Sequence, residues 1–235
     1  MTIPYRLRRS HRATRLRITI QPGGVEVVAP LRTPEREIAA FVGQNRDWIR
    51  DKMAAIERTL ARHPGPERFE SGARIPYRGD AVGLTVLPGR RVTVRFNGGF
   101  EVEVPDEFDD EARQDVIGQA LRQWLGRRAH GDATDYVARH GPRHGLVPRG
   151  LRIKEQKRIW GSCTARGVLN LNWRLILAPP PVFEYVVVHE LCHLRVRNHQ
   201  PEFWRLVAEV LPDYGPRRRW LKEHGHLLSL RPGRA

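Results

Sequence analysis

Apolar and polar residues follow different spacings in the two halves of this 235-residue chain. In the first half, short runs alternate as half-buried strands do, and Asn97-Gly98 between two such runs indicates a hairpin turn. Thr33 as the N-cap and Pro34 as the first residue predict a helical stretch over 34–61, which Gly43-Gln44-Asn45 can divide. We therefore expect a strand-rich N-terminal subdomain over 1–105, with strands at 3–9, 14–20, 25–29, 82–88, 91–96 and 99–104.

In the second half, apolar residues recur at helical spacing. A buried helix over 182–197 carries Phe183, Val187 and Leu191 every fourth position, and this stripe should outweigh the strand preference of the β-branched run at 186–188. Residues 106–235 are predicted to form an α+β domain in which a small sheet packs on helices. Its other elements are a helix over 109–140, strands near 150–157 and 168–174, and a helix over 201–211.

The helix over 182–197 contains the segment His189-Glu190-Leu191-Cys192-His193. On a helix, side chains four residues apart share a face at about 5–6 Å, so both imidazoles can reach one ion at roughly 2.0–2.1 Å. On a strand they would lie roughly 13 Å apart, too far to share a metal. Glu190 would border such an ion without displacing its water, as a general base must. The spacing predicts a hydrolytic zinc site, although histidines on the solvated side of an amphipathic helix would show the same pattern.

A third protein ligand is needed, because catalytic zinc sites usually combine three protein ligands with one water. His199 is our first choice, since it follows His193 by six residues in an elbow before Pro201. An unbroken helix would carry it about 9 Å along the axis, so the helix must end first. Asn198 is the expected break, because Asn tolerates the left-handed conformation that closes a helix. Glu209, on the second helix, is the rival third ligand.

A series of short motifs runs in order along the chain. In the second half they are Arg158–Cys163, Leu169–Leu175, Ala178-Pro179, Tyr185–Leu191, Asn198-His199 with Phe203-Trp204, and Pro212–Tyr214. In the first half they are Ala29-Pro30, Trp48-Ile49 and Tyr77-Arg78-Gly79. In these residues the chain resembles the YgjP-like metallopeptidase family, a branch of the SprT-like zincins, over nearly its whole length.

The resemblance implies a zincin-like metal domain and a zinc-dependent peptidase. By similarity, His189, His193 and His199 would bind Zn²⁺, and Glu190 would be the catalytic acid/base. The related metzincins carry a glycine three residues after the second histidine of the motif, where this chain has Val196. This departure favours a turn later in the chain and argues against true metzincin geometry.

Two further parts of the site follow from the resemblance and from general chemistry. The segment Trp160-Gly161-Ser162 would supply a strand edge that aligns an extended peptide by main-chain pairing. Packing in the core is the alternative role for its tryptophan. The oxyanion that develops during peptide cleavage needs a hydrogen-bond donor, and Tyr214, Arg219 and Asn172 are the candidates.

Charge and cysteine content limit the compartment and the partners. The formal net charge is +15, and all but four of the basic residues are arginine, so the chain should attract anions that include nucleotides and nucleic acid. Cys163 and Cys192 lack a paired metal-binding spacing, so we expect two structural residues in a reducing compartment. No apolar run reaches secretory or membrane-spanning length, so we predict a cytoplasmic protein without a membrane partner.

Three functions are compatible with this sequence. The first is a zinc metallopeptidase that acts on peptide or protein substrates. The second is a metal-dependent nucleoside triphosphate pyrophosphohydrolase, because arginine suits phosphate and activated water also attacks phosphorus. The third is a nucleic-acid-binding protein with an accessory zinc domain, which the basic strand pair at the N-terminus motivates.

Overall fold

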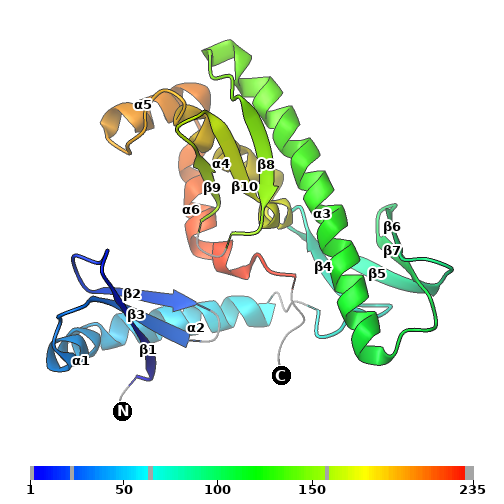
Figure 1. The fold of residues 1–235 in the computed structure, drawn as a ribbon, viewed down its shortest axis with the longest axis horizontal. Coiled ribbons are helices and arrows are strands. Elements are labelled where there is room, and N and C mark those ends of the chain that lie inside the picture. The colour runs from blue at the N-terminus through cyan, green and yellow to red at the C-terminus, as the bar shows by residue number, and fades with distance from the viewer. Residues whose placement is uncertain (1–2, 22–23, 63–65, 157–158, 231–235) are drawn as a thin grey trace. The chain divides into compact units, whose positions relative to one another are not determined.

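The computed structural model describes residues 3–21, 24–62, 66–156 and 159–230 (Figure 1). The chain groups into two compact units, Met1–Pro64 and Gly65–Ala235. Both combine helices with small sheets, so the α+β class is confirmed. The division falls at Pro64–Gly65, whereas the sequence suggested a boundary after residue 105.

The first unit is a three-stranded sheet with helices on one face. Val25, Val27 and Ala29 of its central strand are buried and pack with Ile38 and Ile49 of the helices. The central strand pairs parallel with the first strand and antiparallel with the second. The elements are β1 (Tyr5–Ser10), β2 (Arg17–Gln21), β3 (Gly24–Pro30), α1 (Glu35–Gln44) and α2 (Arg46–Arg62), with sheet order β1-β3-β2.

The start of α1 differs from the sequence prediction. Pro34, rather than Thr33, is the N-cap, and no side chain caps the helix. The carbonyl of Thr33 accepts a hydrogen bond from Arg9 at 2.8 Å, and helical bonding begins at the Pro34 carbonyl. The predicted division of the helical stretch is confirmed at Asn45, whose side chain donates to the Phe41 carbonyl at 2.8 Å.

The second unit begins with a four-stranded sheet that the sequence assigned to the N-terminal half. The Asn97-Gly98 hairpin is confirmed, with Phe96 paired to Phe100 across it. Four aromatic rings form a cluster here, with every pair of ring centroids at most 5.7 Å apart. They belong to Tyr77, Phe96, Phe100 and Trp124. The strands are β4 (Arg74–Tyr77), β5 (Asp80–Pro88), β6 (Thr93–Phe96) and β7 (Phe100–Val104), in the order β4-β5-β7-β6.

The turn between β4 and β5 contacts the C-terminal part of the second unit. Arg78 and Gly79 both have positive φ, and their N–H groups donate to the Ile176 and Leu177 carbonyls at 2.9 and 3.0 Å. Arg78 also binds the buried carboxylate of Asp132 at 2.6 Å. These long-range contacts explain why residues 66–105 group with the C-terminal part of the chain.

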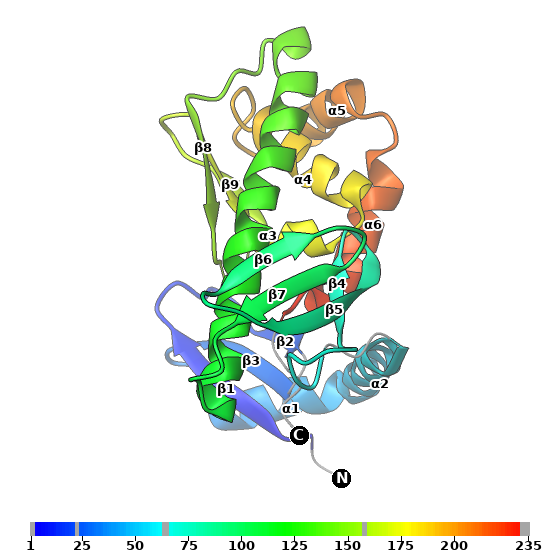
Figure 2. The same cartoon turned by 90° about the vertical axis from the view of Figure 1, so that its right-hand side faces the viewer.

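A long helix, α3 (Asp110–His140), runs along the second unit (Figure 2). It confirms the helix predicted over 109–140, and its N-cap Asp109 accepts from the Ala112 N–H at 2.8 Å. Beyond it lies a second sheet of order β8-β10-β9, in which the central strand pairs parallel with one neighbour and antiparallel with the other. Its strands are β8 (Gly150–Lys154), β9 (Gly161–Cys163) and β10 (Val168–Asn172).

The segment His189–His193 lies at the end of α4 (Pro180–Cys192), the most buried helix of the second unit, with His193 as its C-cap. Residues 182–188 are buried on all sides, which explains how packing overrides the strand preference of three consecutive valines. The helix ends at Cys192, so its predicted end at residue 197 is wrong. The N–H groups of Arg195 and Val196 both donate to the Cys192 carbonyl in a tight turn.

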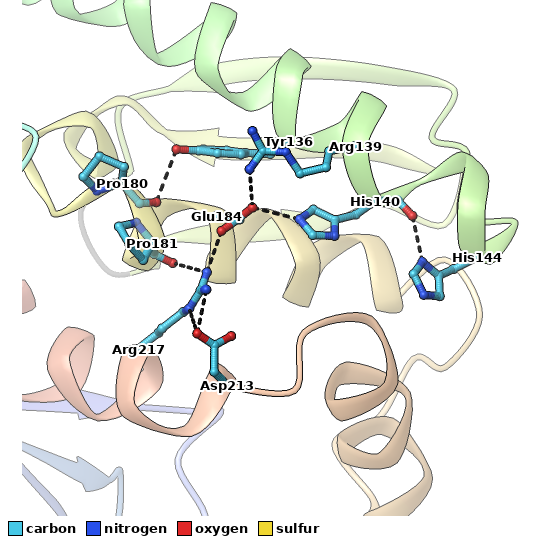
Figure 3. A network of polar contacts seen from close by, with 9 residues as sticks. All are labelled: Tyr136, Arg139, His140, His144, Pro180, Pro181, Glu184, Asp213 and Arg217. Carbon is cyan, nitrogen blue, oxygen red and sulfur yellow. Dashed lines mark hydrogen bonds and ion pairs between the residues drawn. The ribbon is translucent and has the colours of Figure 1, made fainter.

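Two helices complete the unit, α5 (Pro201–Val210) and α6 (Tyr214–His224). The first confirms the helix predicted over 201–211, and the second was not predicted. Glu184 of α4 links α6 to α3 through Arg217 and Arg139, at 2.6 and 2.8 Å (Figure 3). In the parts of the chain that the structure describes, no helix has the length and apolar character needed to span a membrane.

Candidate metal centre

Three histidines meet at the end of α4. The Nε2 atom of His199 lies 3.0 Å from that of His189 and 3.2 Å from that of His193. Among the described residues they form a group whose potential ligand atoms all lie within 4.8 Å. Three nitrogens bound to one tetrahedral zinc ion at 2.0–2.1 Å would be about 3.3 Å apart. The donor set therefore fits a single zinc ion.

The early end of α4 makes this convergence possible. His193 is the C-cap, but its φ and ψ of −67° and −11° keep it near helical geometry, so its ring stays on the face of His189. The following turn reverses the chain before Asn198, whose side chain accepts from the Gln200 N–H at 3.0 Å. His199 is thus delivered from the loop that precedes α5. The sequence foresaw this elbow, but placed the break five residues too late.

A hydrogen bond orients His193, and one aromatic ring contacts all three histidines. The Nδ1 atom of His193 lies 2.9 Å from the Val196 carbonyl, so Nδ1–H donates and the Nε2 lone pair faces the other histidines. Phe203 of α5 lies beneath all three rings, at centroid distances of 4.8, 4.4 and 4.8 Å. The Nδ1 atom of His189 is buried and has no hydrogen-bond partner among the described residues.

The environment favours the neutral form of His189 and His193, which metal ligation requires. Burial, followed by repulsion from His193, His199 and Arg218, lowers the pKa of His189 to about 3. Burial also lowers the pKa of His193, and the hydrogen bond to the Val196 carbonyl only partly opposes that shift. Two of the three rings therefore have free lone pairs at neutral pH.

Glu190 follows His189 on α4 and is buried against Gly161 of β9. Burial raises the pKa of its carboxyl group to about 7, within the range in which a group can both accept and return a proton. A Cβ atom built on Gly161 would lie 2.6 Å from Oε1 of Glu190 and 2.7 Å from its Cγ. The Glu190 carboxylate can therefore pack against this strand because residue 161 has no side chain.

An aromatic and cationic wall borders the histidines on the side of α5 and α6. Trp204 lies 5.7 Å from His189 and 5.9 Å from His199 by ring centroid, and Tyr214 stacks on it at 5.7 Å. The guanidinium of Arg218 lies over the Trp204 ring at 4.2 Å. Arg218 has no signal in the sequence, because it lies on a helix with no buried residue and thus no apolar periodicity.

Other residues that the sequence singled out lie elsewhere. Glu209 is exposed and outside the histidine group. Asn172 is buried, and its amide donates to the carbonyls of Gln156 and Ile159 at 2.7 and 3.2 Å, so it holds a loop. Arg219 is exposed and makes no ion pair within the described residues.

The remaining residues of interest have structural surroundings. Trp160 packs against the core close to Gly225, where an added Cβ would meet its ring at 3.0 Å. Cys192 is fully buried in the core and Cys163 is partly buried, and both are free thiols. Burial, followed by the charge of Glu190, raises the pKa of Cys163 against the opposing influence of Arg197. Arg158 lies outside the described residues.

Comparison with known proteins gives the following matches. The YgjP-like metallopeptidase domain matches residues 14–224. The crystal structure of the metallopeptidase zymogen of Pyrococcus abyssi abylysin is similar with a TM-score of 0.34 and 22% sequence identity. That match covers 41% of this chain and 91% of the abylysin chain. No curated protein matches this sequence significantly.

Proposed function

The chain belongs to the YgjP-like metallopeptidase family, and from that premise we propose that it is a zinc-dependent peptidase. His189, His193 and His199 would hold the ion. The observation that carries this proposal is the convergence of their Nε2 atoms at the end of the helix that also carries the buried Glu190. Three imidazole ligands leave one position open, as in catalytic zinc sites.

A zinc ion held there would supply a Lewis acid and a water of lowered pKa. Glu190 is the general base in this proposal. Its carboxylate takes the proton from the attacking water and then delivers it to the leaving amine. A pKa raised to about 7 by burial suits both steps, because the group is only partly ionised near neutral pH.

The edge strand β9 is the proposed binding site for the substrate backbone. β9 pairs with β10 on one side only, so its other edge can accept an extended peptide by main-chain hydrogen bonding. Gly161 begins this strand and touches Glu190. A peptide bound along β9 would therefore present its carbonyl groups next to the base.

Arg218 and Tyr214 are the proposed donors to the oxyanion. Arg218 acts electrostatically on His189 and lies over Trp204, whose ring borders two of the histidines. Tyr214 stacks on the same tryptophan. Asn172 is not a donor in this scheme, because its amide group already binds two carbonyls.

Metal analysis combined with a matched pair of variants tests the proposal. We expect purified protein to hold near-stoichiometric zinc and to cleave unstructured protein substrates. Glu190→Gln should keep the zinc and lose cleavage, whereas Glu209→Gln, at an exposed acid of α5, should retain both. Protein that folds normally and holds no metal would refute the proposal. Hydrolysis of nucleoside triphosphates without peptide cleavage would instead support a pyrophosphohydrolase.

A further inference from the structure

The first unit has a pocket surrounded by arginines, far in sequence from the histidine motif. It is lined by Arg8 and Arg17, which come from β1 and β2, and by Arg12 and Arg15, which come from the loop between those strands. The hydroxyl groups of Ser10 and Thr14 also line it. A turn in which the Ala13 N–H donates to the Ser10 carbonyl at 3.2 Å shapes the loop.

The strand register explains why these cations gather. Arg8 and Arg17 are both paired with Val28 of the central strand, one on each side. Residues opposite one another in a sheet point to the same face, so two guanidinium groups flank a valine floor. The helices α1 and α2 pack on the opposite face, through Val25, Val27 and Ala29 (Figure 1). The arginine face is therefore the polar face of this sheet.

Most of this positive charge is not neutralised. Arg8 pairs with Glu26, with Nε at 3.3 Å from Oε1. Arg12, Arg15 and Arg17 are exposed and make no ion pair within the described residues. Cations held close together without anions repel one another, and a bound anion relieves that repulsion. The pocket is thus suited to a multiply charged anion.

We propose that this pocket binds adjacent phosphate groups, of the kind that a nucleic-acid backbone or a free polyphosphate presents. Guanidinium groups pair with phosphate oxygens in bidentate geometry, and hydroxyl groups add hydrogen bonds. Arg12, Arg15 and Arg17 make no ion pair within the described residues, and two adjacent phosphates offer these three guanidinium groups more oxygens than one phosphate does. The site lies within the first unit and is independent of the proposed peptidase chemistry.

Fluorescence anisotropy with the full-length protein tests this site. The probe is a short labelled single-stranded oligonucleotide, titrated at several salt concentrations. Arg12→Ala/Arg15→Ala should weaken binding about tenfold and reduce the salt slope by about 1.4, because each phosphate contact with a single strand contributes about 0.7. Arg90→Ala/Arg91→Ala, which removes two exposed arginines from the turn before β6, is the matched control and should change binding far less. Arg12→Lys/Arg15→Lys keeps the charge and should give an intermediate loss, with unchanged thermal melting.

Competition separates the sources of phosphate. Inorganic triphosphate that displaces the oligonucleotide at equal phosphate concentration identifies a free polyphosphate as the ligand. Displacement only at large excess identifies the nucleic-acid backbone, and either result supports the site. Three results would overturn the site. The first is an equal loss of oligonucleotide affinity in Arg12→Ala/Arg15→Ala and Arg90→Ala/Arg91→Ala. The others are competition by polyglutamate as strong as by triphosphate at equal charge, and no binding of oligonucleotide or triphosphate by the unaltered protein.

Discussion

Gly161 of β9 lies directly against the carboxylate of Glu190 on α4. A Cβ atom at residue 161 would come within 2.6 Å of Oε1 and 2.9 Å of Cδ, both closer than nonbonded atoms can approach. The proposed general base and the proposed substrate strand can therefore lie this close because residue 161 has no side chain.

Gly161→Ala should displace the Glu190 carboxylate and reduce kcat by about 100-fold, the lower end of what general acid–base catalysis contributes. Zinc content should stay the same, since the histidine ligands do not touch residue 161. Gly150→Ala in β8 of the same sheet is the control, because an added Cβ there meets Val168 at an ordinary 3.8 Å. Unaltered kcat in the Gly161→Ala protein would contradict the placement of the base.

His199→Ala should lose zinc, because two histidines alone hold the ion weakly. Removal of zinc by a chelator should lower the melting temperature of the unaltered protein, since a ligand that binds only the folded state stabilises it by about 4 kcal/mol at 1,000 times its Kd. The same chelator should leave the melting temperature of His199→Ala unchanged. Glu209→Ala should behave as the unaltered protein in both measurements. Zinc loss from Glu209→Ala with retention in His199→Ala would reverse the assignment of the third ligand.

Adjacent arginines on α6 allow a direct test of the oxyanion donor. Arg218→Ala should lower kcat by up to about 100-fold, as loss of one oxyanion donor does. Arg219→Ala removes the same charge from the exposed neighbouring position and should have little effect. Steady-state kinetics on one peptide substrate would measure both. Equal small effects from the two variants would show that Arg218 contributes only general positive charge.

The parts of the site that the sequence predicted are those with a local signal. His189, Glu190 and His193 have a fixed spacing on one helix, and His199 follows a short turn, so four positions close in sequence define the centre. Gly161 was reached only through the family resemblance of Trp160-Gly161-Ser162, and Arg218 was not predicted. β9 is only three residues long, and α6 has no buried residue, so neither has a period that a sequence pattern could reveal.

The domain boundary is a feature of the fold that also lacks a local sequence signal. Alternation and turn residues predict strands at 82–88, 91–96 and 99–104, and the sequence places them in the N-terminal subdomain over 1–105. Arg78 and Gly79 bond to Ile176 and Leu177, about 100 residues away. These hydrogen bonds form only when the β4–β5 turn packs against residues 176–177, and the alternation of apolar and polar residues within a strand does not predict that contact.

Glu184 provides the last test, which concerns stability and pH. Its side chain is only 11% exposed and accepts hydrogen bonds from Arg139, His140 and Arg217 (Figure 3). Burial alone would raise the pKa of Glu184, but these bonds outweigh it and hold the pKa below the ordinary 4.5. The folded state therefore binds this proton less readily than the unfolded state. The resulting stabilisation is complete above about pH 4.5 and is lost as the pH falls through the lowered pKa.

Glu184→Gln should lower the free energy of unfolding at pH 7 by about 3 kcal/mol, because it removes the buried carboxylate that Arg139 and Arg217 share and leaves Arg217 with Asp213 alone. The difference in the free energy of unfolding between the variant and the unaltered protein should narrow below pH 4.5, since protonation then neutralises Glu184 in the unaltered protein as the substitution does in the variant. Urea denaturation across the pH range would measure this, with Glu223→Gln at an exposed position of α6 as the control. A constant difference from neutral to acid pH would show that the network acts through packing rather than through the charge of Glu184.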